Sequence, residues 1–195
     1  MNLLIVGLLL FLGMHSVSIV APRWRDAQVA RLGEGPWKGI YSVLSIAGFA
    51  LLIYGYGAAR QSPVVLYTPP TALRHLALLL MLPVFPLLLA TYLPGRIKSA
   101  VKHPTLASVK LWALAHLLAN GTLADVLLFG SFLVWAAADR VAVGRRPAPV
   151  RPMFGGKARA NSRTADVIAI VVGLAIYVLF MTYAHVRLFG VSPTP

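Results

Sequence analysis

Five long runs of apolar residues constrain this chain more than any other feature of its sequence. The runs are Asn2–Val20, Gly39–Ala59, Ala72–Leu93, Leu106–Ala138 and Ala165–Leu188. A helix that crosses a bilayer needs roughly 20 apolar residues, and Pro, Gly or basic residues bound each run as they bound helices. Only 12% of the 195 residues are charged, too few for an ordinary soluble domain, and about six crossings with short loops use up the length of the chain. We therefore expect an all-α fold, a polytopic integral membrane helical bundle that forms a single membrane domain over residues 1–195.

The fourth run is too long for one upright helix and must be interrupted. Asn120, Gly121 and Thr122 stand at its centre. Asn-Gly favours a turn whose conformation Gly121 can supply, and Thr122 can cap a following helix. These residues predict a helical hairpin over residues 106–138, and the bundle then has about six helical segments.

The basic residues predict the orientation of the chain. Fifteen of the 18 Lys and Arg lie in or beside three connections, which follow the first, third and fourth runs, and the other three are Arg60, Arg74 and Arg187. Cytoplasmic loops carry excess Lys and Arg, so we expect these connections on the cytoplasmic side and both chain ends outside. The first run lacks a basic segment before it, which favours a retained helix over a cleaved signal peptide.

The most basic connection, residues 139–165, precedes the last helix, residues 166–188. Its prolines and glycines predict an extended loop that rests on anionic lipid head groups. It has Phe154 as its only aromatic residue. Nucleic acid is therefore the poorer partner, because single strands are bound through interleaved aromatic side chains.

Ionisable side chains inside a membrane are costly unless they are paired, hydrated or bound to a ligand, so the few present here are candidate functional residues. The chain has no cysteine, which makes histidine the main candidate metal ligand. His15 precedes Arg23 by eight residues and His116 follows Lys110 by six. Both therefore lie about 9–12 Å inside the cytoplasmic surface. Two neutral imidazoles at matched depth could be the axial ligands of a b-type haem.

The neighbours of these histidines permit two interpretations. Ala113, His116 and Asn120 share one helical face, and Gly7 and Gly13 thin the first helix. Small residues leave room for a flat ring. They equally mark tight helix packing, with the histidines forming hydrogen bonds across it.

Asp125 lies near the outer end of the predicted hairpin. We expect a structural ion pair with His75, Arg74 or His185 on the same side. A proton relay through a carboxylate and a histidine is the alternative.

Three segments of the chain carry a resemblance to a known family. They are Phe11–Arg25 (FLGMHSVSIVAPRWR), Arg31–Arg60 (RLGEGPWKGIYSVLSIAGFALLIYGYGAAR) and Lys110–Gly130 (KLWALAHLLANGTLADVLLFG). Together they resemble the bacterial NnrU family over about residues 1–140. That family is associated with nitrite and nitric oxide metabolism in denitrifying bacteria, which implies a multi-pass protein of the bacterial inner (cytoplasmic) membrane.

The NnrU family is in turn distantly similar to the plastid 15-cis-ζ-carotene isomerase, whose two haem b ligands lie in His-Ser and Leu-Ala-His motifs. The matching residues here are His15-Ser16 and Leu114-Ala115-His116. The resemblance implies haem b as cofactor, with His15 and His116 as ligands of the haem iron. Ala113 stands where that enzyme has a cysteine, so a ligand switch to thiolate is not available. Asn120, Asp125 and His75 are candidate supporting residues.

Three functions stay open at this point. The chain could be a haem b protein acting in redox chemistry, in nitric oxide sensing or as a carotenoid-isomerase-like enzyme, and a small apolar or gaseous ligand would suit it. It could be a membrane assembly or regulatory factor without a cofactor. It could also form a proton or small-molecule pathway through the hairpin, beside Asp125, His75 and His185.

Overall fold

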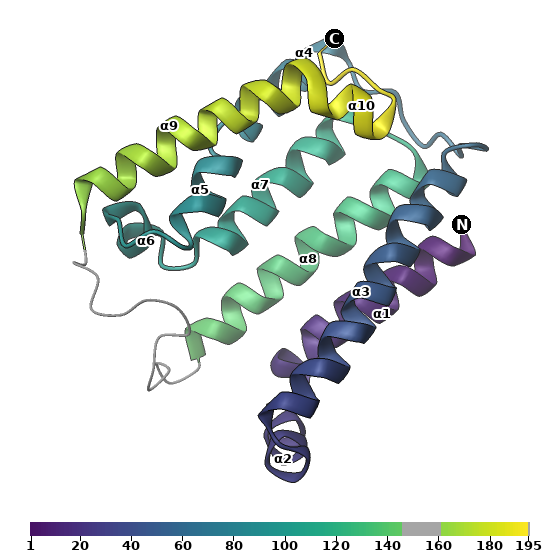
Figure 1. Cartoon of the computed structure of the whole chain (residues 1–195). Coiled ribbons are helices and arrows are strands. Elements are labelled where there is room, and N and C mark those ends of the chain that lie inside the picture. Colours follow the sequence, from purple (N-terminus) through teal and green to yellow (C-terminus); the bar gives the residue numbers. More distant parts are fainter. Residues whose placement is uncertain (146–160, 195) are drawn as a thin grey trace. The chain divides into compact units, whose positions relative to one another are not determined.

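The apolar runs are α-helices in the computed structural model, which describes residues 1–145 and 161–194 (Figure 1). The helices are α1 (Asn2–Val20), α2 (Pro22–Leu32), α3 (Glu34–Ala59), α4 (Thr71–Met81), α5 (Val84–Ala90), α6 (Arg96–Val101), α7 (Pro104–Ala119), α8 (Leu123–Arg145), α9 (Arg163–Leu179), the π-helical turn η1 (Phe180–Ala184) and α10 (His185–Phe189).

Five stretches of the described chain are long and apolar enough to cross a membrane: α1, α3, α4 with α5, α8, and α9 through α10. The apolar helix α7 is shorter, at 16 residues. The prediction of a polytopic helical membrane bundle with about six segments is thus confirmed.

The interruption of the fourth run lies where the sequence predicts it, between α7 and α8. Thr122 and Asp125 form a capping box: the backbone N–H of Asp125 donates to Oγ1 of Thr122 over 3.3 Å, and the backbone N–H of Thr122 donates to Oδ2 of Asp125 over 2.9 Å. Gly121 was expected to supply a special backbone conformation, and that reason was wrong. Positive φ occurs at Gly33 and Gly190 among the described glycines, whereas Gly121 is needed because a Cβ there would overlap the carbonyl oxygen of Tyr67.

Three other elements differ from the pattern of apolar runs. Helix α2 occupies the first basic connection, where Pro22 suits the first helical turn. The third run divides into α4 and α5 at Pro83, whose ring cannot continue a helix without a break. Helix α8 continues to Arg145, so the first part of the predicted loop 139–165 is helical, and residues 146–160 of that loop lie outside the described residues.

Contacts divide the described chain into two compact units that interleave along the sequence. Unit 1 contains Met1–Tyr67 and Gly121–Gly144, which carry α1, α2, α3 and α8. Unit 2 contains Thr68–Asn120 and the C-terminal helices from α9 onward. The single membrane domain expected from the sequence stays a prediction.

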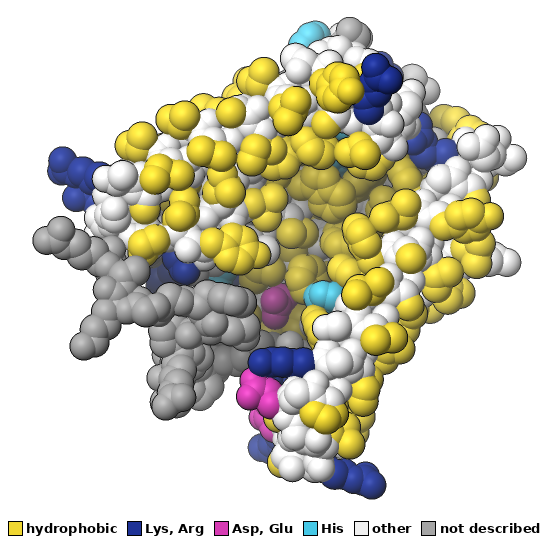
Figure 2. Space-filling view, viewed as in Figure 1, with side chains coloured by type: hydrophobic (Ala, Val, Ile, Leu, Met, Phe, Trp, Pro, Cys, Tyr) yellow, Lys and Arg dark blue, Asp and Glu magenta, His cyan; other side chains and the backbone are white. Residues whose placement is uncertain are grey.

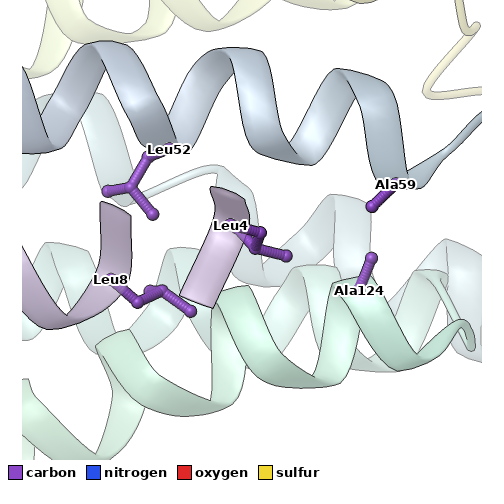
Figure 3. Packing of buried hydrophobic residues seen from close by; sticks show 5 residues of the cluster. All are labelled: Leu4, Leu8, Leu52, Ala59 and Ala124. Carbon is purple, nitrogen blue, oxygen red and sulfur yellow. The ribbon is translucent and has the colours of Figure 1, made fainter. Parts of the chain in front are cut away.

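Glycines allow α1 and α3 to pack side by side in unit 1. A Cβ on Gly7 would lie 2.6 Å from the backbone N of Leu52, and one on Gly48 would lie 2.7 Å from the backbone N of Phe11. Such close approach of two helix backbones is the usual way to gain van der Waals contact in a membrane, where water does not drive helices together. Figure 3 shows the apolar cluster that results, with side chains from α1, α3 and α8: Leu4, Leu8, Leu52, Ala59 and Ala124.

In unit 2, helix α5 packs on α9 and α7, and α4 packs on α7. Gly173 of α9 lies against the backbone of Pro86, because a Cβ there would come within 2.6 Å of the Pro86 Cα. The carboxylate of Asp166 accepts hydrogen bonds of 3.0 Å from the backbone N–H groups of Arg96 and Ile97, and so caps α6. Figure 2 shows hydrophobic side chains along the outer face of α9, the face expected to contact lipid.

Candidate functional site

His15 lies in the second half of α1 within an aromatic cluster of unit 1. Its ring stacks on Phe11, with ring centroids 4.2 Å apart. The ring of Tyr41 in α3 lies at 5.3 Å, and that of Trp135 in α8 stands edge-on at 6.0 Å. The imidazole is half-buried, and its Nδ1 is 2.7 Å from the carbonyl oxygen of Phe11, one helical turn earlier.

His116 lies in the last turn of α7, in unit 2. Its Nδ1 is 2.8 Å from the carbonyl oxygen of Trp112, again one turn earlier, and the Trp112 ring lies 5.3 Å away. Asn120 donates a 2.9 Å hydrogen bond from its side-chain amide to the backbone carbonyl of His116, where the helix ends. Asn120 therefore supports the backbone that carries the histidine.

The two hydrogen bonds define the chemical form of both imidazoles. A backbone carbonyl can only accept, so Nδ1 of His15 and of His116 must carry the proton. In a neutral imidazole the lone pair then lies on Nε2, which is the form that binds a metal, and a bond from Nδ1–H to a carbonyl is the common way to orient such a ligand. His185 has the same arrangement with the carbonyl of Val191, at 2.7 Å, so this feature alone does not single out the pair.

Most small residues near the histidines contribute to close helix packing and leave no space for a flat ring. Gly7 holds α1 against α3, and Ala113 and Ala115 are buried at 0% and 1% exposure. A Cβ on Gly13 would meet no other atom within 4 Å, so space remains beside α1 at this position.

Asp125 does not form the expected ion pair in unit 1. The Tyr56 hydroxyl donates to its Oδ1 over 2.5 Å, and the backbone N–H and hydroxyl of Thr122 donate to its Oδ2. Arg74, His75 and His185 belong to unit 2 instead. Asp125, 5% exposed, thus joins α3 to the start of α8, and neutral donors satisfy its carboxylate.

His75 lies on α4 with an exposed side chain. Within the ranges that the structure covers, no three His, Cys, Asp or Glu residues gather as a metal site would require. A site with two axial histidines needs no such group.

Sequence reasoning missed Tyr41 and Trp135, the aromatic residues beside His15. A signal for them was present. Tyr41 follows Lys38 by three residues and Trp135 precedes Arg140 by five, so both lie in the end of their apolar run that a basic connection flanks, as His15 does. Aromatic residues in that end of neighbouring helices are candidates for the wall of the same site.

Comparison with protein families gives one finding. The family described as NnrU protein matches residues 3–193, which extends past the motifs of the first 140 residues and includes the last helix. Neither the curated proteins nor the solved structures contain a match to the chain.

Proposed function

The chain belongs to the NnrU family, and from this premise we propose that it binds haem b in the bacterial inner membrane and acts in nitrite and nitric oxide metabolism. His15 and His116 would be the axial ligands of the haem iron. One observation carries the proposal: at each of these two motif histidines, Nδ1–H donates to the carbonyl one turn earlier, and Nε2 is left in the form that binds iron.

The residues around each histidine suit this role. The carbonyls of Phe11 and Trp112 fix the tautomer and raise the basicity of the ligand nitrogen. The rings of Phe11, Tyr41 and Trp135 give His15 a mainly apolar surrounding, which helps to exclude water. When bound, a b-type haem supplies one-electron redox chemistry and an iron that can bind a diatomic gas such as nitric oxide.

An absorption spectrum tests the proposal. Protein purified in detergent after expression with ample haem should show a Soret band, and after reduction the α and β bands of six-coordinate haem. His15→Ala and His116→Ala should each weaken or change these bands. His185→Ala is the matched control, because His185 has the same hydrogen-bond arrangement but lies outside the motifs. Its spectrum should equal that of the wild type.

Two results would contradict this assignment. Wild-type protein that folds but carries no porphyrin would exclude haem as the cofactor. Haem that survives the loss of His116 would require another ligand set.

The second candidate function is a membrane assembly or regulatory factor without a cofactor. The close packing of small residues favours it, since Ala113 and Ala115 are buried on the helix that carries His116 and Gly7 holds α1 to α3. In that case the histidines form hydrogen bonds within their helices and have no ligand role. A folded, colourless wild type whose stability falls in His15→Ala, as a packing role requires, would support this function.

A further inference from the structure

A groove of about 380 Å³ lies within unit 2, where α5, α6 and α9 meet. Ile170 and Leu174 of α9 are 42% and 38% exposed, so the groove is open on the face expected to contact lipid. Its lining side chains are all apolar and include Pro83, Pro86, Leu87, Ile97, Ile170 and Leu174. Such a groove suits the hydrocarbon chain of a lipid.

Helix α9 connects this groove to a basic end. Arg163, Asp166, Ile170 and Leu174 follow one another at intervals of three and four residues, so they lie on one face of the helix. At 1.5 Å per residue, Ile170 and Leu174 come about 10 and 16 Å after Arg163 along the helix axis. The face that forms the apolar wall therefore carries a cation at its start.

Helix α6 lies against this basic end of α9 (Figure 1). The carboxylate of Asp166 holds the two helices together, because its two oxygens accept hydrogen bonds from the backbone N–H groups of Arg96 and Ile97. Ile97 lines the groove, and its neighbours in α6 are Arg96 and Lys98. Cations from two helices thus flank the same end of the groove.

The charge at this end is not balanced by protein acids. Arg96, Lys98 and Arg163 form no ion pair within the described residues, and Arg96 and Arg163 are exposed. Asp166 is the one acid beside them, which leaves a net charge of about +2. Residues 146–160 contain no Asp or Glu that could supply a counterion. An anionic group from outside the protein would complement these cations.

We propose that this site binds one molecule of an anionic phospholipid. An acyl chain lies against the apolar wall, and the phosphate lies beside Arg96, Lys98 and Arg163, whose long side chains reach the head-group level. A lipid without net charge would fill the groove but leave the cations without a counterion. Inorganic phosphate would meet the cations but leave the groove empty. The inference goes beyond the general attraction of basic connections to head groups, and it does not depend on haem.

Native mass spectrometry of detergent-purified protein, titrated with dioleoyl phosphatidylglycerol or dioleoyl phosphatidylcholine, tests the charged part of the site. The wild type should bind one phosphatidylglycerol at least about tenfold more tightly than phosphatidylcholine, because each Lys or Arg near anionic lipid contributes about fivefold in affinity. Arg96→Gln/Arg163→Gln should lose about 10- to 30-fold in affinity for phosphatidylglycerol and none for phosphatidylcholine. Arg23→Gln/Arg31→Gln is the matched control, since it removes two exposed cations from α2 in unit 1. It should bind as the wild type does.

A second pair of variants tests the groove. Ile170→Trp should fill it and weaken the binding of both lipids at least about fivefold. Val171→Trp is the control, because Val171 is the next residue, is 60% exposed and does not line the groove. Dihexanoyl phosphatidylglycerol, with the same head group but short chains, should bind the wild type at least about tenfold more weakly. This lipid decides the question if size-exclusion profiles show that Ile170→Trp is not folded.

Three results would overturn the proposal. Equal affinity of the wild type for the two dioleoyl lipids would show that the cations select no head group. Equal losses in the two double variants would reduce the effect to overall charge. Displacement of phosphatidylglycerol by excess inorganic phosphate would leave a simple anion site. Absorption spectra of the same samples report haem separately, so the lipid site and the haem assignment can fail independently.

Discussion

Substituting Gly55 by alanine tests whether backbone contact holds α1 against α3. Gly55 is buried in α3, where an added Cβ would lie 2.6 Å from the carbonyl carbon of Leu3 and 2.7 Å from the Cα of Leu4. Both are backbone atoms, which cannot rotate away as the end of a flexible side chain can. The two helices must therefore separate, or one of them must bend.

The distances set the size of the effect. Ordinary contact of a Cβ begins at 3.4 Å, so restoring it from 2.6 Å requires a shift of at least about 0.8 Å, and the backbone N of Leu4 lies nearer still. A gap of 0.5–1 Å forfeits roughly a quarter to a half of each van der Waals contact it opens. The buried side chains of Leu4, Leu8 and Leu52 lie at this interface and would lose such contacts. We expect Gly55→Ala to lower the free energy of unfolding by about 1–3 kcal/mol.

Gly57→Ala, two residues further along the same helix, is the control because its Cβ meets nothing within 4 Å. It should change stability little, with any gain limited to about 1 kcal/mol from helix propensity. Heating detergent-purified protein and following the folded fraction by size-exclusion chromatography measures both. Gly55→Ala should lower Tm by about 2–4 °C for each kcal/mol lost. If both variants unfold at the same temperature, backbone contact does not hold these helices together.

Three further predictions concern other parts of the chain. Gly121→Leu should sharply reduce the yield of folded protein, because the side chain would overlap the Tyr67 carbonyl, whereas Gly130→Leu should not; equal yields would contradict this packing. Asp166→Ala removes the cap of α6 and should cost about 0.5–2 kcal/mol in thermal unfolding, and an unchanged Tm would show the cap to be dispensable. A C-terminal alkaline phosphatase fusion should be active and a green fluorescent protein fusion dark, since the basic connections predict external termini; the reverse would mean that the fourth apolar run crosses once.

The helices could be predicted from the sequence because in a membrane the length of an apolar run and the residues that end it decide most of the structure. Helix α1 matches its run at both ends, and the break at residues 120–122 was expected from Asn-Gly and the capping threonine. Helix α2 was not expected, because it has no apolar run: it forms between two spanning helices and exposes nearly all its side chains. Pro83 was passed over because the apolar residues continue on both sides of it.

Membrane depth and motif matches predict which histidines belong to the candidate site, but they do not predict the contacts of those histidines. Counting residues from Arg23 and Lys110 selects His15 and His116, but gives neither the carbonyl that each Nδ1 meets nor the rings beside them. Asp125 shows the limit most clearly. Its depth suggested a cation as partner, whereas its carboxylate accepts a hydrogen bond from the hydroxyl of Tyr56, 69 positions earlier. Such a pairing depends on how helices rotate about their axes, which a single sequence does not record.

The interleaving of the two units has a consequence for how the protein is made. Unit 1 takes its last segment, α8, from the chain after Gly121, and unit 2 takes α9 from later still. Helices α1 and α3 can pair early in synthesis, but the hydrogen bond from the Tyr56 hydroxyl to Asp125 can form only after Asp125 has left the ribosome. A nascent chain stalled at Asn120 holds no complete unit. Each unit can therefore complete its packing only after residues beyond Gly121 have been synthesised.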